Sequence, residues 1–259
     1  MEVITRNSAE QAVRLVARLL EARIRAKPDA VLGLATGRTM ERVYAELVAS
    51  GVSLARCTSF NLDEYIGLSP EDPNSYRSYM NEHLFSKVDI DLANTHVPDG
   101  AAADLKAAAQ DYENRISQAG GIDLQLLGIG EAGHIGFNEP LSSLMSRTRD
   151  KALTPVTRAQ NAGMFGGDPD RVPKRALTMG VGTILDAREL ILLATGPAKA
   201  AIVARAVEGP VTSMISASAL QLHPNCKIIV DEAAASRLEG REYYDFVFAN
   251  EPEWAEFRD

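Results

Sequence analysis

The chain has 259 residues, a length at which one large domain can bury about three quarters of the surface that the unfolded chain exposes. Apolar residues make up 46% and the net charge is −8, which indicates a globular protein with a core and argues against nucleic-acid binding, because nucleic-acid-binding domains are usually basic. No apolar run approaches the roughly 18 residues of a membrane span, and the N-terminus lacks a signal pattern. Both cysteines lie in apolar runs typical of reduced core residues. We therefore expect a cytoplasmic protein that binds neither nucleic acid nor membranes.

Apolar patterning predicts helices and strands that alternate along the chain. A stripe of apolar residues after the capping pair Ser8 and Gln11 predicts the first helix. Short apolar runs that end in glycine or in acids are typical of strands buried on both faces. In chain order we expect a helix at 8–27, a strand at 30–37, a helix at 39–50, a strand at 57–65, helices at 75–88 and 101–119, strands at 122–130 and 189–196, a helix at 199–209 and a strand at 226–231.

This alternation favours an α/β fold, with an open, mostly parallel, doubly wound (Rossmann-like) sheet and helices on both faces. We find no internal repeat and no linker composition, so we expect one domain over residues 1–259. In sheets of this kind, ligands bind outside the carboxyl ends of the strands. The residues that suggest chemistry in this sequence all follow such strand ends.

The stretch ATGRT, residues 35–39, joins an expected strand to an expected helix. Its glycine lets the backbone approach an anion, and the start of a helix offers free N–H groups. The stretch is neither a Walker A loop nor GxGxxG, so it predicts a phosphate site without indicating a nucleotide. An ordinary turn and a solvated lysine are the simpler alternatives. The candidate phosphate ligands are Thr36, Gly37, Arg38, Thr39 and Lys199.

The stretch FNLDEY ends an expected strand with Asp63 and Glu64. Adjacent strand residues point to opposite faces, so we do not expect these two acids to act as one pair. A solvated strand end is the simpler interpretation of this stretch alone.

The glycine-rich stretch GIGEAGHIGFNEP, residues 128–140, contains His134 and Glu139. Histidine exchanges protons near neutral pH, and a nearby carboxylate can orient its imidazole. The pair therefore predicts acid–base catalysis, with an incidental loop histidine as the alternative. No second histidine lies at ligand spacing, so we expect no metal.

Taken together and in this order, the segments LGLATGRT, FNLDEYIGL, GIGEAGHIGFNEP, SSLMSRTR, VPKRALTMGVGTILDA and LQLHPN resemble the glucosamine-6-phosphate deaminase family over nearly the whole chain. The resemblance implies that glucosamine 6-phosphate and water give fructose 6-phosphate and ammonia, without a cofactor. It also implies that His134, supported by Glu139, moves the proton that opens the sugar ring. Asp63 would then transfer the C2 proton toward C1, while the ATGRT loop and Lys199 hold the phosphate.

Three positions depart from the family pattern. Ala132 replaces a carboxylate that some members carry two residues before the histidine, and Gly163 replaces a phosphate-binding arginine. Arg38 stands where a small residue is usual, so we expect it to supply the cation missing at Gly163. The segment 163–173, rich in glycine and proline, is expected to act as a mobile lid.

The resemblance extends to regulation, because some bacterial members are hexamers activated by N-acetylglucosamine 6-phosphate. We accordingly expect a homo-oligomer and an effector site, although Ala152 replaces a threonine of the family's effector pattern. The matching positions are Ser142, Ser143, Arg149, Lys151 and Tyr244.

Three alternative functions belong to the same fold. A galactosamine-6-phosphate deaminase/isomerase would use the same acid and histidine on the C4 epimer. A 6-phosphogluconolactonase needs no C2 base, so Asp63 argues against it. A non-catalytic sugar-phosphate sensor would need a DNA-binding segment, and only about 30 residues precede the first expected strand.

Overall fold

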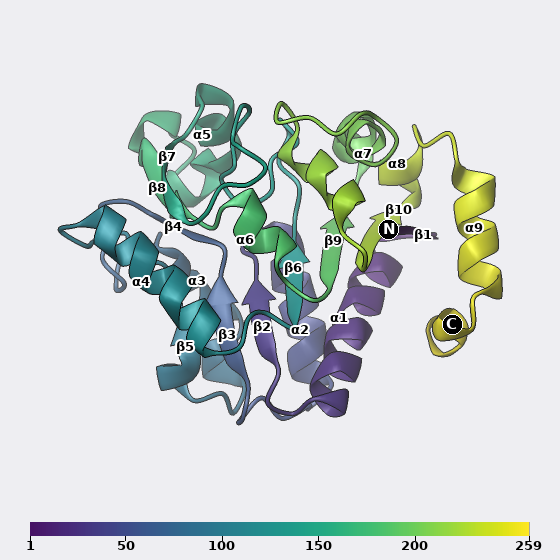
Figure 1. Cartoon of the computed structure of the whole chain (residues 1–259), viewed down its shortest axis with the longest axis horizontal. Coiled ribbons are helices and arrows are strands. Elements are labelled where there is room, and N and C mark those ends of the chain that lie inside the picture. Colours follow the sequence, from purple (N-terminus) through teal and green to yellow (C-terminus); the bar gives the residue numbers. More distant parts are fainter. Residues whose placement is uncertain (259) are drawn as a thin grey trace.

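The computed structural model describes residues 1–258, which form an open α/β fold around a seven-stranded sheet. Every neighbouring pair in this sheet is parallel, and the strand order is β1–β10–β9–β6–β2–β3–β5. Helices lie on both sides of the sheet (Figure 1), so the predicted fold class is confirmed. The strands are β1 (Glu2–Arg6), β2 (Val31–Leu34), β3 (Thr58–Asn61), β5 (Thr95–His96), β6 (Leu124–Leu127), β9 (Leu190–Ala194) and β10 (Cys226–Asp231).

A second, three-stranded antiparallel sheet was not expected from the sequence. Its order is β4–β8–β7, with bounds β4 (Asp63–Tyr65), β7 (Arg149–Ala152) and β8 (Arg175–Thr178). The expected strand at 57–65 therefore breaks at Leu62. The N–H of Leu62 donates to the Leu34 carbonyl at 3.1 Å, and its carbonyl accepts from the Met179 N–H at 2.7 Å. Asp63 and Glu64 consequently begin a strand of the smaller sheet and do not close a strand of the larger one.

Five helices within residues 1–258 match the predicted ranges, and four others were not predicted. Ser8 caps α1 by accepting from the Gln11 N–H, and Asp104 caps α4, which therefore begins later than position 101. Among residues 1–258, no helix is both long and apolar enough to span a membrane. The helices are α1 (Ala9–Ala26), α2 (Arg38–Ala49), α3 (Tyr76–His83), α4 (Leu105–Gln118), α5 (Pro155–Asn161), α6 (Val181–Leu185), α7 (Ala200–Val207), α8 (Glu232–Ala235) and α9 (Arg241–Asn250), with short 3₁₀ segments that include η3 (Ala162–Phe165), η5 (Pro197–Lys199) and η7 (Pro252–Phe257).

The strand order opens a crevice at the centre of the large sheet. From β2 the chain proceeds to β3 and β5 on one side, and it then returns to β6 on the other side of β2. The connections that leave β2 and β6 therefore diverge, which is where open parallel sheets bind ligands. Apolar residues of both sheets belong to one continuous buried core.

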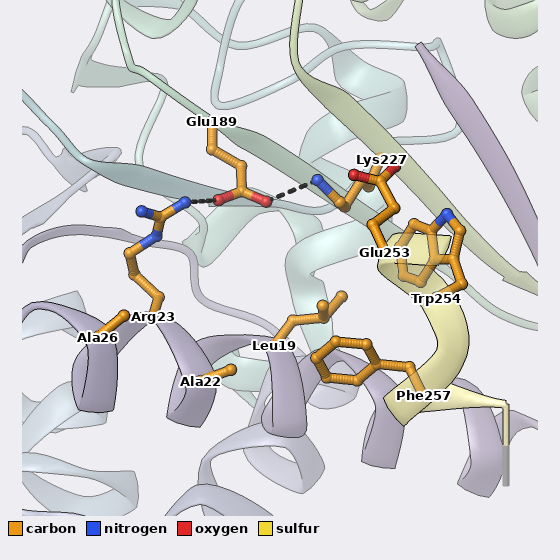
Figure 2. Close-up of a pocket in the computed structure, with 9 residues that line it drawn as sticks. All are labelled: Leu19, Ala22, Arg23, Ala26, Glu189, Lys227, Glu253, Trp254 and Phe257. Carbon is orange, nitrogen blue, oxygen red and sulfur yellow. Dashed lines mark hydrogen bonds and ion pairs between the residues drawn. The ribbon is translucent and has the colours of Figure 1, made fainter. Parts of the chain in front are cut away.

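The last turn of the chain packs against α1 and the amino ends of β9 and β10. Trp254, which is 1% exposed, and Phe257 form one wall of a cleft of about 280 Å³. Figure 2 shows the charged floor of this cleft, where Glu189 bridges Arg23 and Lys227. The Lys227 ammonium lies 2.8 Å from the Glu189 carboxylate and 5.7 Å from the Trp254 ring centre. A buried ion pair thus joins β9 to β10 beneath the C-terminal segment.

Removing the charge of Lys227 should destabilise the fold. Lys227→Met keeps an apolar stem but leaves the buried Glu189 carboxylate short of one partner, and such losses cost about 3 kcal/mol. Chemical denaturation would measure this change. Arg25→Met is the matched control, since Arg25 pairs with Glu21 on the exposed face of α1 and should change stability by about 0.5 kcal/mol or less. Equal stability of the two variants would contradict the prediction.

Candidate active site

A cavity of about 480 Å³ opens at the carboxyl ends of β2, β3, β6 and β9. It gathers every residue predicted for catalysis or phosphate binding except Glu139, which lies behind His134. The segments that supply these residues are far apart in the sequence, and the parallel sheet brings them to one edge. The predicted residues that line the cavity are Thr36, Gly37, Arg38, Thr39, Asp63, His134 and Lys199.

The predicted phosphate loop leads directly into α2. Gly37 is the residue before the helix and has φ 120°, a backbone conformation that favours glycine. Its carbonyl accepts from the N–H groups of Met40 and Glu41 and from the Tyr79 hydroxyl. No side chain caps the helix start, so the N–H groups of Arg38 and Thr39, which precede these two donors, can bind an anion.

Arg38 reaches across the cavity to Gly163. A Cβ atom built on Gly163 would lie 2.8 Å from Nη2 of Arg38, so the guanidinium occupies the space beside that glycine. Both residues line the cavity. A side chain at position 163 and the present position of Arg38 therefore exclude each other. The segment 163–173 itself forms η3 and a second 3₁₀ turn at Pro169–Arg171.

Lys199 approaches the cavity from the end of η5. Its ammonium donates to the Ile129 carbonyl at 2.7 Å, and burial lowers the pKa of the lysine while the charge of Glu131 opposes that shift. Asp231 holds the preceding loop by accepting from the Gly196 N–H at 3.0 Å. One donor of Lys199 is thus committed to the protein, which leaves two for a ligand.

Asp63 and Glu64 separate as strand geometry predicts. The Glu64 carboxylate accepts from the backbone N–H groups of Tyr65, Tyr76 and Arg77, so it holds the start of α3. Asp63 instead lines the cavity, although it is only 6% exposed. Burial raises the pKa of Asp63 to about 8, and repulsion by Glu64 acts in the same direction. Asp63 therefore has the properties of a buried, strongly basic carboxylate.

His134 and Glu139 form a buried pair on the glycine-rich loop. The imidazole packs on Gly130, where an added Cβ would lie 2.1 Å from Nε2. Nδ1 of His134 lies 3.6 Å from Oε2 of Glu139, slightly beyond hydrogen-bond distance. Burial raises the pKa of Glu139, but interactions with His134, Thr157 and the Thr154 N–H outweigh burial and lower it to about 2. Glu139 is therefore an ionised carboxylate at neutral pH.

The neighbouring Glu131 does not replace the carboxylate that is absent at position 132. Glu131 is exposed, and its N–H donates to the side chain of Gln160 at 3.3 Å. The His134 imidazole consequently has Glu139 as its carboxylate partner. Within residues 1–258, no group of three or more His, Cys, Asp or Glu side chains is arranged to hold a metal ion.

The predicted effector residues are not all brought together. Arg149 lies on β7 and donates to the Asn138 side chain of the histidine loop at 2.7 Å. Ser142 is buried, Ser143 accepts from the Met145 N–H, and Lys151 follows Arg149 on β7. Figure 1 shows α9, which carries Tyr244, at the opposite end of the molecule from β7.

Tyr244 has a separate partner, because its hydroxyl donates to Glu208 at 2.9 Å. Within one chain, Tyr244 on α9 therefore lies apart from the predicted effector residues on β7. The distance between Tyr244 and the residues on β7 depends on where α9 packs, which the sequence does not indicate.

Several cavity residues were not identified from the sequence. Tyr76 and Tyr79 come from α3, Gln160 and Asn161 from the end of α5, and Thr195 follows β9. Their residue types carry no pattern that indicates catalysis. The helix start Thr154–Pro155 was the available signal for α5, since threonine caps helices and proline favours the first helical position.

Comparisons with known proteins agree with this geometry. A family model described as glucosamine-6-phosphate isomerases/6-phosphogluconolactonase matches residues 5–228. The glucosamine-6-phosphate deaminase of Streptomyces coelicolor is 48% identical over 258 residues, which cover 98% of this chain and 99% of that protein. That of Shewanella woodyi is 51% identical over 251 residues, which cover 95% of this chain and 94% of that protein.

Solved structures similar to this chain include distant ones, which share only its fold, and one with much higher sequence identity. A 6-phosphogluconolactonase from Trypanosoma brucei has a TM-score of 0.73 at 20% identity, over 92% of this chain and 98% of that chain, which shows a shared fold. A monomeric glucosamine-6-phosphate deaminase has a TM-score of 0.89 at 43% identity, over 92% of this chain and 100% of that chain. From the family model and these long, close matches, the chain belongs to the glucosamine-6-phosphate deaminase family.

Proposed function

We propose that the chain converts glucosamine 6-phosphate and water to fructose 6-phosphate and ammonia. One observation favours this function over the alternatives of the same fold. A buried basic carboxylate, a His–Glu pair and a cationic loop at a helix start line or adjoin one cavity, in a chain about half identical to deaminases. The first group suits proton removal from carbon, the second suits ring opening, and the third suits a phosphate.

Phosphate binding is assigned to the loop before α2. The uncapped N–H groups of that turn offer hydrogen bonds to a dianion. Arg38 and Lys199 add two positive charges, which matters in a chain of net charge −8. A guanidinium matches phosphate oxygens with two parallel donors, so Arg38 is the stronger specificity element.

Ring opening is assigned to His134 and Glu139. The carboxylate at Nδ1 favours the tautomer with its proton on that nitrogen, which leaves Nε2 to exchange a proton with the substrate. His134 takes the proton of the C1 hydroxyl and delivers one to the ring oxygen, so the C1–ring oxygen bond breaks and an open-chain aldehyde forms. The charge of Glu139 stabilises the imidazolium formed between these two transfers.

Carbon chemistry is assigned to Asp63. The carboxylate removes the C2 proton, the electron pair of the C2–H bond forms the C1–C2 double bond, and the aldehyde oxygen takes a proton from water to become the C1 hydroxyl of an enolamine. Return of the proton to C1 leaves an imine at C2, to which water adds before ammonia departs as the ketose forms. A base with a raised pKa is suited to this step, because the proton on carbon is weakly acidic.

The effector site and the homo-oligomer stay predictions. Arg149 links β7 to the histidine loop through Asn138, which gives an anion near β7 a physical connection to His134. The solved deaminase of similar structure is monomeric, so it lends no support to a hexamer. The cytoplasmic location also stays a prediction.

Asp63→Asn should reduce turnover at least the roughly 10²–10⁴-fold typical of a lost general base. The amide keeps the shape of the side chain, so substrate should still bind. Ammonia release would measure turnover, and calorimetric titration with the substrate would measure affinity. Near-normal turnover in this variant would contradict the assignment of Asp63.

The pKa of Asp63 predicts the pH dependence of the reaction. The base acts in its deprotonated form, and its pKa is raised to about 8, so kcat/KM should rise as pH increases through about 8. Below that value kcat/KM should fall about tenfold per pH unit. Glu64→Gln removes the repulsion that adds to this shift and should move the rise in kcat/KM to lower pH. A rise near pH 4 in the unmodified protein, where an ordinary aspartate titrates, would contradict the prediction.

Arg38→Ala should raise the Michaelis constant by about tenfold, because a hydrogen bond to a charged group contributes roughly 1.5–3 kcal/mol. Arg38→Lys should recover only part of this loss, since an ammonium lacks the planar pair of donors. Arg42→Ala is the matched control, because Arg42 lies one turn further along α2 and pairs with Glu10 outside the cavity. Saturation kinetics of Arg38→Ala that match those of the control would show that Arg38 does not bind phosphate.

A further inference from the structure

The loop that leads into α2 is held by a tyrosine of another helix. The hydroxyl of Tyr79, on α3, donates to the Gly37 carbonyl at 2.8 Å, although the two residues are 42 positions apart in the chain. The same carbonyl accepts from the N–H groups of Met40 at 2.8 Å and Glu41 at 3.2 Å, as is usual at a helix start. Three donors therefore converge on one carbonyl oxygen, and one of them comes from outside α2.

Gly37 needs such a restraint from outside. Its φ of 120° is a backbone conformation that favours glycine, and a Cβ atom added there would meet no heavy atom within 4 Å. Glycine has no side chain that could pack and fix the turn. The hydrogen bonds to its carbonyl consequently determine how this peptide unit is oriented.

The Gly37 carbonyl belongs to the same peptide unit as the Arg38 N–H. The unit is planar and its two polar groups point in opposite directions, so a restraint on the carbonyl also fixes the N–H. Since the carbonyl faces donors within α2, the Arg38 N–H points out of the helix start. Donors to a carbonyl also polarise the peptide unit, which makes its N–H a stronger donor. Tyr79 thus acts on both the direction and the strength of an N–H group at the proposed phosphate site.

Tyr79 is itself held in place by its surroundings. Glu64 accepts from the N–H groups of Tyr76 and Arg77 at the start of α3, which fixes that helix. The Tyr79 side chain is 7% exposed, and its ring centre lies 4.5 Å from that of His83. Tyr79 lines the cavity, but its single hydroxyl proton is committed to Gly37. This arrangement favours restraint of the loop over direct donation to a ligand.

We propose that Tyr79 is a positioning residue whose hydroxyl orients the peptide unit between Gly37 and Arg38, so that the Arg38 N–H faces the substrate phosphate. This inference rests on the proposed function, because it deepens the assignment of the phosphate to this loop. Glu64, which holds the start of α3, directly follows Asp63 in the chain. Helix α3 thus connects the segment that carries the proposed base to the loop that binds the phosphate.

Tyr79→Phe tests the role directly, because it keeps the ring and removes the hydroxyl. We expect the KM for glucosamine 6-phosphate and the inhibition constant of inorganic phosphate each to rise about fivefold, the effect of one lost neutral hydrogen bond. The value of kcat should stay within about twofold, because the phosphate contact is the same in the ground state and the transition state. Ammonia release at varied substrate and phosphate concentrations measures all three constants. Unchanged KM and inhibition constant, or a loss confined to kcat, would overturn the proposal.

Tyr112→Phe is the matched control. Tyr112 is also buried, and its hydroxyl donates from α4 to a backbone carbonyl, that of Asn61 at 2.6 Å, but it lies outside the cavity. The control should unfold at a temperature similar to Tyr79→Phe and keep the inhibition constant of phosphate unchanged. An equal rise of that constant in the control would attribute the effect to general loosening of the fold and contradict the role of Tyr79.

The amide resonance of Arg38 separates positioning from direct contact. In ¹⁵N-labelled protein without ligand, loss of the hydrogen bond to the Gly37 carbonyl should move the Arg38 amide nitrogen to lower frequency in Tyr79→Phe. Saturation with inorganic phosphate should then shift the Arg38 amide proton less than in the unmodified protein, because the N–H is a weaker donor. Weaker phosphate binding with an unmoved Arg38 resonance in the free protein would mean that the hydroxyl contacts the phosphate itself, which would refute positioning.

Inorganic phosphate also distinguishes the two levels of the argument. If it neither inhibits the unmodified protein nor shifts the Arg38 amide, the phosphate site of the proposed function is itself contradicted. If it binds the unmodified protein and Tyr79→Phe equally well, the phosphate site stands and only the role of Tyr79 is contradicted.

Discussion

The transfer of the chain from one sheet to the other at Leu62 is the constraint on which the site depends. The N–H of this residue bonds to β2 of the large sheet, and its carbonyl bonds to Met179, just beyond β8 of the small sheet. The next residue, Asp63, is thereby carried into the cavity, while Glu64 turns to the start of α3. A continuous strand would have placed both acids along one sheet edge. As a result of the break, the Asp63 carboxylate lines the cavity, while the Glu64 carboxylate binds backbone N–H groups of α3.

Two glycines of the site let polar side chains approach the backbone. His134 packs on Gly130 at a distance that no Cβ could share, and the Arg38 guanidinium occupies the space beside Gly163. In both places the absent side chain is what admits a titratable or charged group. Arg38 and Gly163 are therefore sterically linked, because a larger residue at position 163 would displace the guanidinium from its present position.

The two carboxylates of the proposed mechanism are distinguished by their surroundings. Asp63 is buried close to Glu64, and both effects raise its pKa. Glu139 is also buried, but His134 and the first turn of α5 supply enough hydrogen-bond donors and charge to lower its pKa. Environments that shift two acids in opposite directions let one serve as a base for carbon and the other as a permanent charge. The acidic chain then depends on Arg38 and Lys199 for the local positive charge that a phosphate requires.

The alternation of apolar strands and helices determined the α/β class, because burial on both faces of a parallel sheet leaves a local pattern in the sequence. The same pattern predicted that residues 36–39, Asp63, His134 and Lys199 would meet, since the carboxyl ends of parallel strands share one edge. Local patterning could not predict the small sheet, whose strand β4 pairs with residues more than a hundred positions away. Nor could it place the Thr154 N–H against Glu139 or Tyr244 far from β7. These features arise from contacts between distant segments, whose free energy depends on packing in three dimensions and leaves no periodic signal along the chain.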